Sequence, residues 1–278
     1  MNVLIMLVTL INPILKEDKV VINKTYQLDD PGKMMVIIDN IYGDVEVEPS
    51  NDNTVYLTLE ILISAHTDAL VDKAKSELGL GEILADDSLM FYTKAPFVKR
   101  CDWRNGGWGY DMRDQPKYAF KYQYKLKVPK NVSLEAKTIN NGDVTVKNID
   151  GSVKACNVNG SVSIKNARKV QQASTVNGDV TINFLESPKE PIDFNTVNGD
   201  FNFELPEDFS SQVYFDSMHG DLYTSFDYRK SSPKVTKSDE HGRFKIGTKT
   251  GVEIGSGGPE LSFRSINGNV YLKKSTDR

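Results

Sequence analysis

Few residues of this chain have the types and spacings that catalysis requires. The three histidines, His66, His219 and His241, are far apart in the sequence and lack the spacing of metal ligands. The chain contains no G-x-S-x-G nucleophile motif, no H-E-x-x-H zinc motif and no phosphate-binding loop. We therefore expect no catalytic residues, no metal site and no cofactor.

An acidic ladder is the first arrangement that could bind an ion. The residues that follow successive repeated glycines are Asp143, Ser161, Asp179, Asp200 and Asp221. If coils stack about 4.8 Å apart, the last three become neighbours on one edge. Calcium-binding rolls use a comparable nine-residue unit with G-G-x-G-x-D corners, whereas each corner here has one glycine and one acid. We favour carboxylates that bond the N–H groups of their own turn over a calcium site, which needs six to eight oxygens.

Aromatic residues in an irregular stretch could bind sugar. Trp103, Trp108 and Tyr110 lie around the paired glycines 106 and 107, where exposed rings could form a stacking platform. They are our candidate ligand-binding residues. The alternative is a lid that covers one end or edge of a sheet, and we give it more weight.

Basic side chains could form a polysaccharide-binding groove. Lys147, Lys154 and Lys165 should point outward, as in the groove of a parallel β-helix lyase. This makes a polysaccharide-active enzyme the alternative function. A solvated outer face explains the same residues more simply, and we favour it.

These residues must be positioned by an internal repeat. Segments such as VNGSVSI, VNGDVTI and VNGDFNF recur along the chain, and spacings between their glycines are nine, eighteen or twenty-one residues. The expected corner glycines are Gly142, Gly151, Gly160, Gly178, Gly199, Gly220 and Gly268. We expect them to take a positive φ, which glycine tolerates best.

The repeat predicts half-buried strands. The residue two places after each glycine is always apolar, and its two neighbours along the chain are mostly polar. An antiparallel meander of Asn-Gly hairpins would place Thr175 opposite Val180, and so pair polar with apolar side chains. A solenoid lets every apolar column face one core. We therefore predict an all-β protein, a β-solenoid with coils of about 18–21 residues.

Composition and length set broad limits. The chain has 278 residues, of which 39% are hydrophobic and 26% charged, so it can bury a sizeable core as a soluble protein. The net charge of −4 argues against a nucleic-acid partner. Its two cysteines, Cys101 and Cys156, are too few for a disulfide framework or a zinc site, and we favour unpaired thiols.

Three regions are expected. Residues 1–19 form a hydrophobic leader, which resembles a secretory signal and is too short for a confident membrane span. Residues 20–130 form a β-rich region with one short helix near residues 66–80, for which Thr67 is a candidate cap. Residues 131–275 form the solenoid, continuous with the preceding region, with a polar surface insertion near residues 228–243 and a last coil around Gly268.

The order of these signals resembles a family of uncharacterised bacterial proteins labelled putative adhesins. Such proteins have an early N-x-x-G-D unit, a strand that ends in L-x-V-P and repeated T-x-N-G-hydrophobic coils. The matching segments here are 40–45, 126–129, 175–180, 196–201 and 255–272. The pair Met218-His219 departs from the pattern, and the segment 139–141 is shifted by one residue. The resemblance implies a β-solenoid in or outside the cell envelope, without an established reaction.

These observations favour a non-catalytic protein of the cell envelope or exterior. We expect it to be exported, without a transmembrane span in the mature chain. Its partner is an extracellular glycan or protein, and the sequence does not decide between them. A purely structural scaffold is the third alternative.

Overall fold

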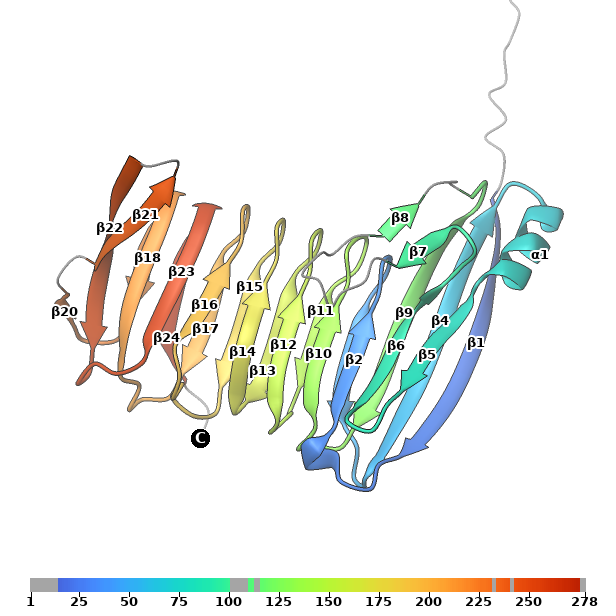
Figure 1. Cartoon of the computed structure of the whole chain (residues 1–278), viewed down its shortest axis with the longest axis horizontal. Helices are drawn as coiled ribbons and strands as arrows, with labels where there is room; N and C mark the ends of the chain where they lie inside the picture. Colours follow the sequence, from blue (N-terminus) through green and yellow to red (C-terminus); the bar gives the residue numbers. More distant parts are fainter. Residues whose placement is uncertain (1–14, 101–109, 113–115, 232–233, 241–242, 276–278) are drawn as a thin grey trace, which may run out of the picture.

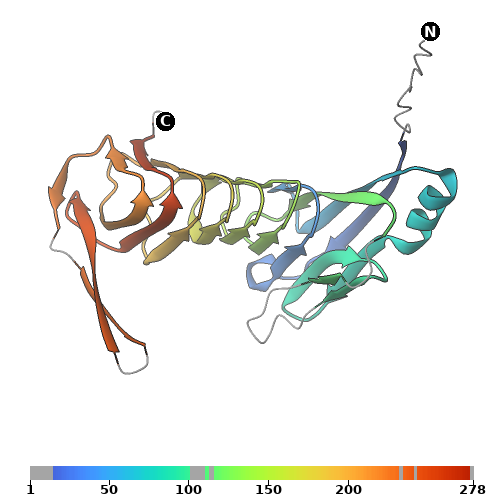
Figure 2. The same ribbon diagram turned by 90° about the horizontal axis from the view of Figure 1, so that it is seen from above.

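Two facing β-sheets form an elongated body in the computed structural model, which describes residues 15–100, 110–112, 116–231, 234–240 and 243–275 (Figure 1). Figure 2 shows the sheets as two layers joined by corners. The helix α1 (Asp68–Glu77), the short turn η1 (Pro31–Lys33) and the separate pair β7 (Val98–Arg100) and β8 (Tyr110–Met112) accompany them.

Sheet A has ten strands in the order β1-β4-β9-β3-β11-β13-β15-β17-β24-β19. Their bounds in that order are Lys16–Gln27, Thr54–Ala65, Ala119–Val128, Val45–Pro49, Val144–Lys147, Val162–Ala167, Val180–Phe184, Phe201–Leu205, Val270–Lys274 and Leu222–Thr224. The strands from β9 to β19 pair in parallel, whereas β1, β4 and β9 pair antiparallel at one end.

Sheet B follows the order β20-β22-β18-β23-β16-β14-β12-β10-β2-β6-β5, and β21 pairs with β22. The bounds from β20 to β5 are Tyr228–Lys230, Arg243–Ile254, Ser211–His219, Glu260–Asn267, Ile192–Asn195, Lys169–Ser174, Ser152–Cys156, Ser133–Lys137, Met35–Asp39, Ser88–Lys94 and Gly79–Leu84, and β21 is Lys234–Glu240. The polar stretch expected as a surface insertion thus contributes the strands β20, β21 and the start of β22.

Each central coil contains one strand of sheet B, a corner and one strand of sheet A. Neighbouring coils pair in parallel, so that Val162 lies between Val144 and Val180. Parallel pairing excludes the hairpin meander, whose neighbouring strands would run antiparallel. The predicted all-β solenoid is confirmed.

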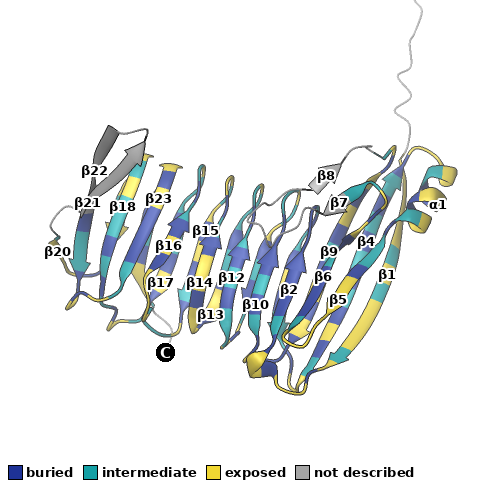
Figure 3. Cartoon of the chain, viewed as in Figure 1, coloured by how far each residue is buried: buried dark blue, intermediate teal, exposed yellow. Residues whose placement is uncertain are grey.

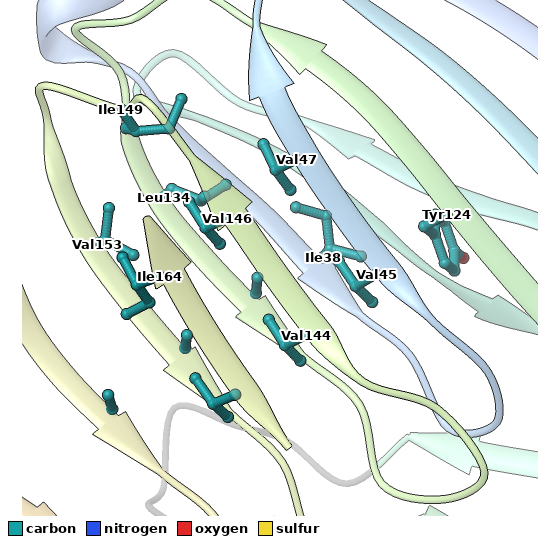
Figure 4. Close-up of a cluster of buried hydrophobic side chains, with 14 of the residues drawn as sticks. Ile38, Val45, Val47, Tyr124, Leu134, Val144, Val146, Ile149, Val153 and Ile164 are labelled. Carbon is teal, nitrogen blue, oxygen red and sulfur yellow. The ribbon is translucent and has the colours of Figure 1, made fainter. Parts of the chain in front are cut away.

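The apolar columns fill the space between the sheets. Val144 and Val146 of sheet A share the interior with Leu134 and Val153 of sheet B, and none of the four is more than 1% exposed (Figure 4). Outward-facing residues between them are intermediate or exposed (Figure 3). Each fully buried aliphatic side chain contributes about 1.5–3 kcal/mol of transfer free energy, so the core grows with every coil.

Coils at both ends lie out of sequence order. At one end β2 and β3 sit between the strands β6 and β9, which follow them in the chain, and the coil β10–β11. At the other end the last coil of the chain, β23–β24, sits between β16–β17 and β18–β19. The repeat around Gly268 is therefore the last coil in sequence, but it is not at the end of the body.

Glycines at one corner of each coil stack into a column. In spatial order the glycine column contains Gly43, Gly142, Gly160, Gly178, Gly199, Gly268 and Gly220. A Cβ added to Gly199 would lie 1.9 Å from the carbonyl oxygen of Gly178. Neighbouring backbone therefore occupies the space of a side chain, and this close approach is the main requirement for glycine.

Gly151 lies at the opposite corner of its coil from the glycine column, against the carbonyl of Val132. The nine-residue spacing from Gly142 to Gly151 and on to Gly160 thus alternates between the two corners of a coil. The expectation of positive φ at every corner glycine was wrong. Positive φ occurs at Gly199 (149°) but not at Gly220.

The N-terminal region forms one end of the body, and its core contains buried aromatic side chains. Tyr122 and Tyr124 of β9 are fully buried, so the aromatic face of this strand belongs to the core. The expected helix is α1, and the Thr67 side chain accepts a hydrogen bond from the N–H of Leu70 (3.3 Å). β1 begins at Lys16, so residues 16–19, which the sequence assigned to the end of the leader, pair with β4.

Residues 1–14, which make up most of the expected leader, lie outside the described residues. Among those that are described, no helix has the length and apolar character to cross a membrane.

Candidate functional site

Asparagine side chains form a ladder along the glycine corner. The amide nitrogen Nδ2 of Asn177 donates to Oδ1 of Asn159 (2.8 Å), and Nδ2 of Asn198 donates to Oδ1 of Asn177 (2.7 Å). The asparagine ladder continues from Asn159 to Asn140 and from Asn267 to Asn198, each at 2.7 Å. These exposed amides therefore bind one another as a continuous strip.

Buried polar side chains brace the same corners. Thr175 Oγ1 donates to the carbonyl of Gly160 (2.8 Å), and Asn157 Nδ2 donates to the carbonyl of Gly142 (2.9 Å). Ser217 and Ser265 hold this position in the coils at the C-terminal end, and their buried hydroxyls have no partner among the described residues. The corners are thus held most firmly in the central coils.

The acidic ladder has a different geometry from the one expected. Oδ1 of Asp179 accepts the N–H of Asp200 in the next coil (2.8 Å), and Oδ1 of Asp200 accepts the N–H of Asn269 (2.7 Å). Asn269 separates Asp200 from Asp221, and Ser161 separates Asp143 from Asp179. The prediction that Asp200 and Asp221 are neighbours was wrong, because the sequence does not show that another coil lies between them.

This column is a set of links between coils. The carboxylates of Asp143, Asp179 and Asp200 each accept a backbone N–H of the neighbouring coil, whereas we expected each to bond its own turn. The Asp221 carboxylate accepts the Tyr223 hydroxyl. Asp44 extends the column, since its Oδ1 accepts the N–H of Asp143 (2.9 Å). Among the described residues, no three His, Cys, Asp or Glu side chains gather closely enough to hold a metal ion.

The aromatic candidates from the sequence stay untested. Trp103 and Trp108 lie outside the described residues, and Tyr110 is the first residue of β8, where its backbone pairs with Arg100. Cys101 also lies outside them. Cys156 is unpaired, and burial raises the pKa of its thiol.

The three candidate lysines do not form one groove. Lys147 and Lys165 are neighbours in sheet A, whereas Lys154 belongs to sheet B. Lys147 instead pairs with Glu48 of β3, with 2.7 Å between Nζ and Oε1. The side-chain hydrogen bond from Lys147, and then its charge, hold the pKa of Glu48 below its usual range. His66 and His219 lie in separate parts of the fold, after β4 and at the end of β18.

Sequence reasoning missed a polar hollow on the outer face of sheet A. It encloses about 710 Å³, and β3, β4, β9 and the loop after β3 line it. Its acidic and basic residues are Glu46, Glu48, Asp52, Glu60, Lys125 and Lys127. The Tyr56 hydroxyl donates to Oδ2 of Asp52 (2.8 Å), and this bond is the main cause of a lowered pKa for that carboxyl. Both shifted carboxyls, Glu48 and Asp52, are therefore held ionised.

Two tyrosines stack on each other at the other end of sheet A, where Tyr223 is exposed and Tyr271 is half-buried. The rings of Tyr223 on β19 and Tyr271 on β24 stack with centroids 5.1 Å apart and planes 10° apart. Nδ2 of Asn269 donates to the Tyr271 hydroxyl (3.3 Å), and the Tyr223 hydroxyl donates to Oδ2 of Asp221 (3.5 Å). The Lys273 ammonium lies 5.7 Å from the centroid of the Tyr271 ring. We call Tyr223 and Tyr271 the tyrosine pair.

This arrangement of parallel coils, corner ladders and an exposed outer face defines an all-β solenoid. Residues 130–252 match the model of the Toastrack family, DUF4097. The comparison with curated proteins found no match.

Three solved structures are similar to the chain over most of its length. One is a putative cell adhesion protein from Clostridium sporogenes, with 8% identity and a TM-score of 0.40, covering 94% of this chain and 100% of that one. Another is a putative adhesin from Bacteroides fragilis, with 12% identity, a TM-score of 0.36, and coverage of 92% and 97%. A third is a putative lipid binding protein from Parabacteroides distasonis, with 14% identity, a TM-score of 0.31, and coverage of 92% and 97%.

Proposed function

We propose that this protein is a non-catalytic binding protein of the cell envelope or exterior, and that it binds glycan with the tyrosine pair. The observation that carries the proposal is the stacked, exposed pair itself. Tyr223 is 49% exposed, a large fraction for an aromatic ring on a strand.

The tyrosine pair offers one ring face for stacking. Its centroid separation of 5.1 Å is close to the spacing of neighbouring strands, so the rings stack along the axis of the solenoid. β19 is the last strand of sheet A, and no further strand of that sheet covers the far face of Tyr223. A sugar ring has a flat face of C–H groups that can pack on this surface.

Polar groups beside the rings suit the hydroxyls of a sugar. The Asp221 carboxylate and the Asn269 amide are both near the phenol oxygens of the pair. Lys273 adds a cation on the same side. A flat apolar surface with a few oriented polar groups is the general pattern of a small-ligand site. Because these residues lie on or next to strands, the fold holds them in place before a ligand arrives.

The alternative function is a polysaccharide-active enzyme that uses the polar hollow. A glycoside hydrolase needs a carboxylic acid whose pKa is raised, so that it can protonate a leaving group. The pKa values of Glu48 and Asp52 move in the opposite direction. These two carboxyls therefore do not suit the role of the acid in such a hydrolase.

Export is part of the same proposal. The apolar run from Val3 to Leu15 precedes the charged residues Lys16, Glu17 and Asp18, as in a secretory signal. N-terminal sequencing of the mature protein from its native host tests this point. Recovery of an intact Met1 in the cytoplasmic fraction would contradict export.

A glycan array with the purified protein tests the binding proposal. Tyr223→Ala should weaken binding to the best glycan about tenfold or more, because it removes the open stacking face. Tyr223→Phe should retain most of the affinity. The matched control is Tyr228→Ala, which removes a ring that is 57% exposed on β20. Equal binding by wild type and Tyr223→Ala, or no glycan binding at all, would overturn the proposal.

A further inference from the structure

Five Asn-Gly sequences among the described residues are of the type that can undergo spontaneous deamidation. In such a pair the backbone nitrogen of glycine can attack the side-chain carbon Cγ of asparagine, because glycine has no Cβ to hinder the approach. The pairs begin at Asn141, Asn159, Asn177, Asn198 and Asn267. A sixth, at Asn105, lies outside the described residues.

Four of the five asparagines are locked by the asparagine ladder. In each, Nδ2 donates to the neighbouring rung at 2.7 or 2.8 Å. The attacking nitrogen is occupied as well: the N–H of Gly178 donates to the carbonyl of Asn198 (2.8 Å), and the N–H of Gly199 donates to that of Asn267 (2.9 Å). Gly160 and Gly268 donate in the same way, at 2.9 and 3.1 Å. Reaction at these sites requires both kinds of bond to open.

Asn141 is different because its corner has one extra residue. The side chain of Asn140 occupies the ladder position of this corner, where its Oδ1 accepts the hydrogen bond from Nδ2 of Asn159. Asn141 therefore lies outside the ladder. The extra residue adopts a left-handed backbone, with φ of 57°, and is exposed. Among the described residues, neither its side chain nor the N–H of Gly142 makes a hydrogen bond. The ladder therefore has one unprotected Asn-Gly pair.

We propose that Asn141 is a site of spontaneous deamidation, and that the ladder suppresses the same reaction at the other four pairs. The Gly142 nitrogen forms a bond to Cγ of Asn141, the bond from Cγ to Nδ2 breaks, and ammonia leaves with the proton from the Gly142 N–H. Water then opens the resulting succinimide at either carbonyl, which yields aspartate or isoaspartate. No oxidant or reductant takes part.

The product changes a corner that joins two regions. A new carboxylate at position 141 would lie two residues from Asp143, whose N–H is held by Asp44 of the N-terminal region. Isoaspartate would also add one backbone carbon between β10 and β11. Both changes fall where β11 meets β3.

Peptide mass spectrometry of the intact folded protein, after incubation at mildly alkaline pH, tests the proposal. Asn177 and Asn198 are matched internal controls, since all three sites read Asn-Gly-Asp-hydrophobic. Deamidation at Asn141 should be at least about tenfold faster than at either control, because the controls must first break two hydrogen bonds. In denaturant the three rates should become similar. Equal rates in the folded protein, or a preference for Asn141 that persists in denaturant, would overturn it.

Two variants sharpen this test. Asn141→Gly keeps a residue that tolerates positive φ and should abolish the fast phase. Asn159→Ala removes the rung that accepts from Asn177, so deamidation at Asn177 should rise toward the rate at Asn141. No change at Asn177 in a variant that remains folded would show that the ladder does not protect.

Discussion

The central coils and the two ends of the solenoid use the same contacts with different chain connectivity. Between β10 and β17, a ladder bond joins residues 18, 19 or 21 positions apart, such as Asn159 to Asn177 and Asn177 to Asn198. At the C-terminal end the same bond joins Asn198 to Asn267, 69 positions apart. The bonds at the corners therefore form between coils that are neighbours in space, whatever the order of those coils in the sequence.

The difference concerns what holds each coil in place. A central coil is tied covalently to the coils on both sides of it. The coil β23–β24 is tied by short connections to neither β16–β17 nor β18–β19, and contacts alone keep it between them. We expect the ends to depend more on packing than the centre does, and the following changes test this.

Removal of the last coil should have the largest effect. A chain that ends at Gly258 loses four fully buried side chains, Leu261, Phe263, Val270 and Leu272. At about 1.5–3 kcal/mol each, the loss of about 6–12 kcal/mol rivals the whole stability of a typical domain. Circular dichroism should show loss of the cooperative melt, whereas a chain ending at Ser275 should melt like the full chain. A cooperative melt at the original temperature would contradict this account of the end.

A single core truncation in the in-order region should cost less. Phe201→Ala on β17 removes a fully buried ring and should cost about 3–5 kcal/mol in the free energy of unfolding. Thr181→Ala, on the exposed face of β15, should change it by less than about 0.5 kcal/mol. Denaturant titration measures both. Equal effects would mean that we have assigned the wrong set of alternating residues to the core.

The glycine column should be sensitive to a single methyl group. Gly199→Ala places Cβ against the carbonyl of Gly178 at a φ of 149°, and should cost about 2–4 kcal/mol. Gly79→Ala is the matched control, because nothing lies within 4 Å of an added Cβ there. A melting temperature of Gly199→Ala equal to that of the control would show that the coils separate easily at this corner.

Loss of an asparagine-ladder bond should cost the same free energy of unfolding in the central coils as at the C-terminal end. Asn177→Ala removes two bonds of the ladder and Asn267→Ala removes one, and each lost bond should cost about 1 kcal/mol. Thermal melts of the two variants measure the costs. A much larger cost at Asn267 would show that the out-of-order coil depends on its ladder bond more than on its core.

The smallest effect should come from the ion pair between β3 and β11. The folded pKa of Glu48 lies below its unfolded value, so the contribution of the pair is present above that value and lost as pH falls through the folded pKa. Glu48→Gln should therefore reduce the difference in melting temperature between neutral and acidic pH, by about 1 °C because the pair is exposed. An increased difference would reverse the sign of this argument.

The central coils could be predicted from the sequence because local periodicity reports local pairing. The alternation around Gly160, Gly178 and Gly199 specified strand phase, the buried column and parallel stacking. The spatial order of the coils at the two ends could not be predicted from the sequence, since nothing in it shows that β24 lies beside β19. The neighbours Tyr223 and Tyr271 were missed for that reason, as was Asn269 between two aspartates.

The out-of-order coil has a consequence for how the protein is made. A chain that emerges N-terminus first can stack β10 to β17 as it appears, one coil on the last. The strands β18 and β19 emerge next, but their final neighbours, β23 and β24, emerge only after β20, β21 and β22. The coil β18–β19 can therefore take its final place only after β24 has emerged, and in a chain that crosses a membrane unfolded this step would take place on the far side.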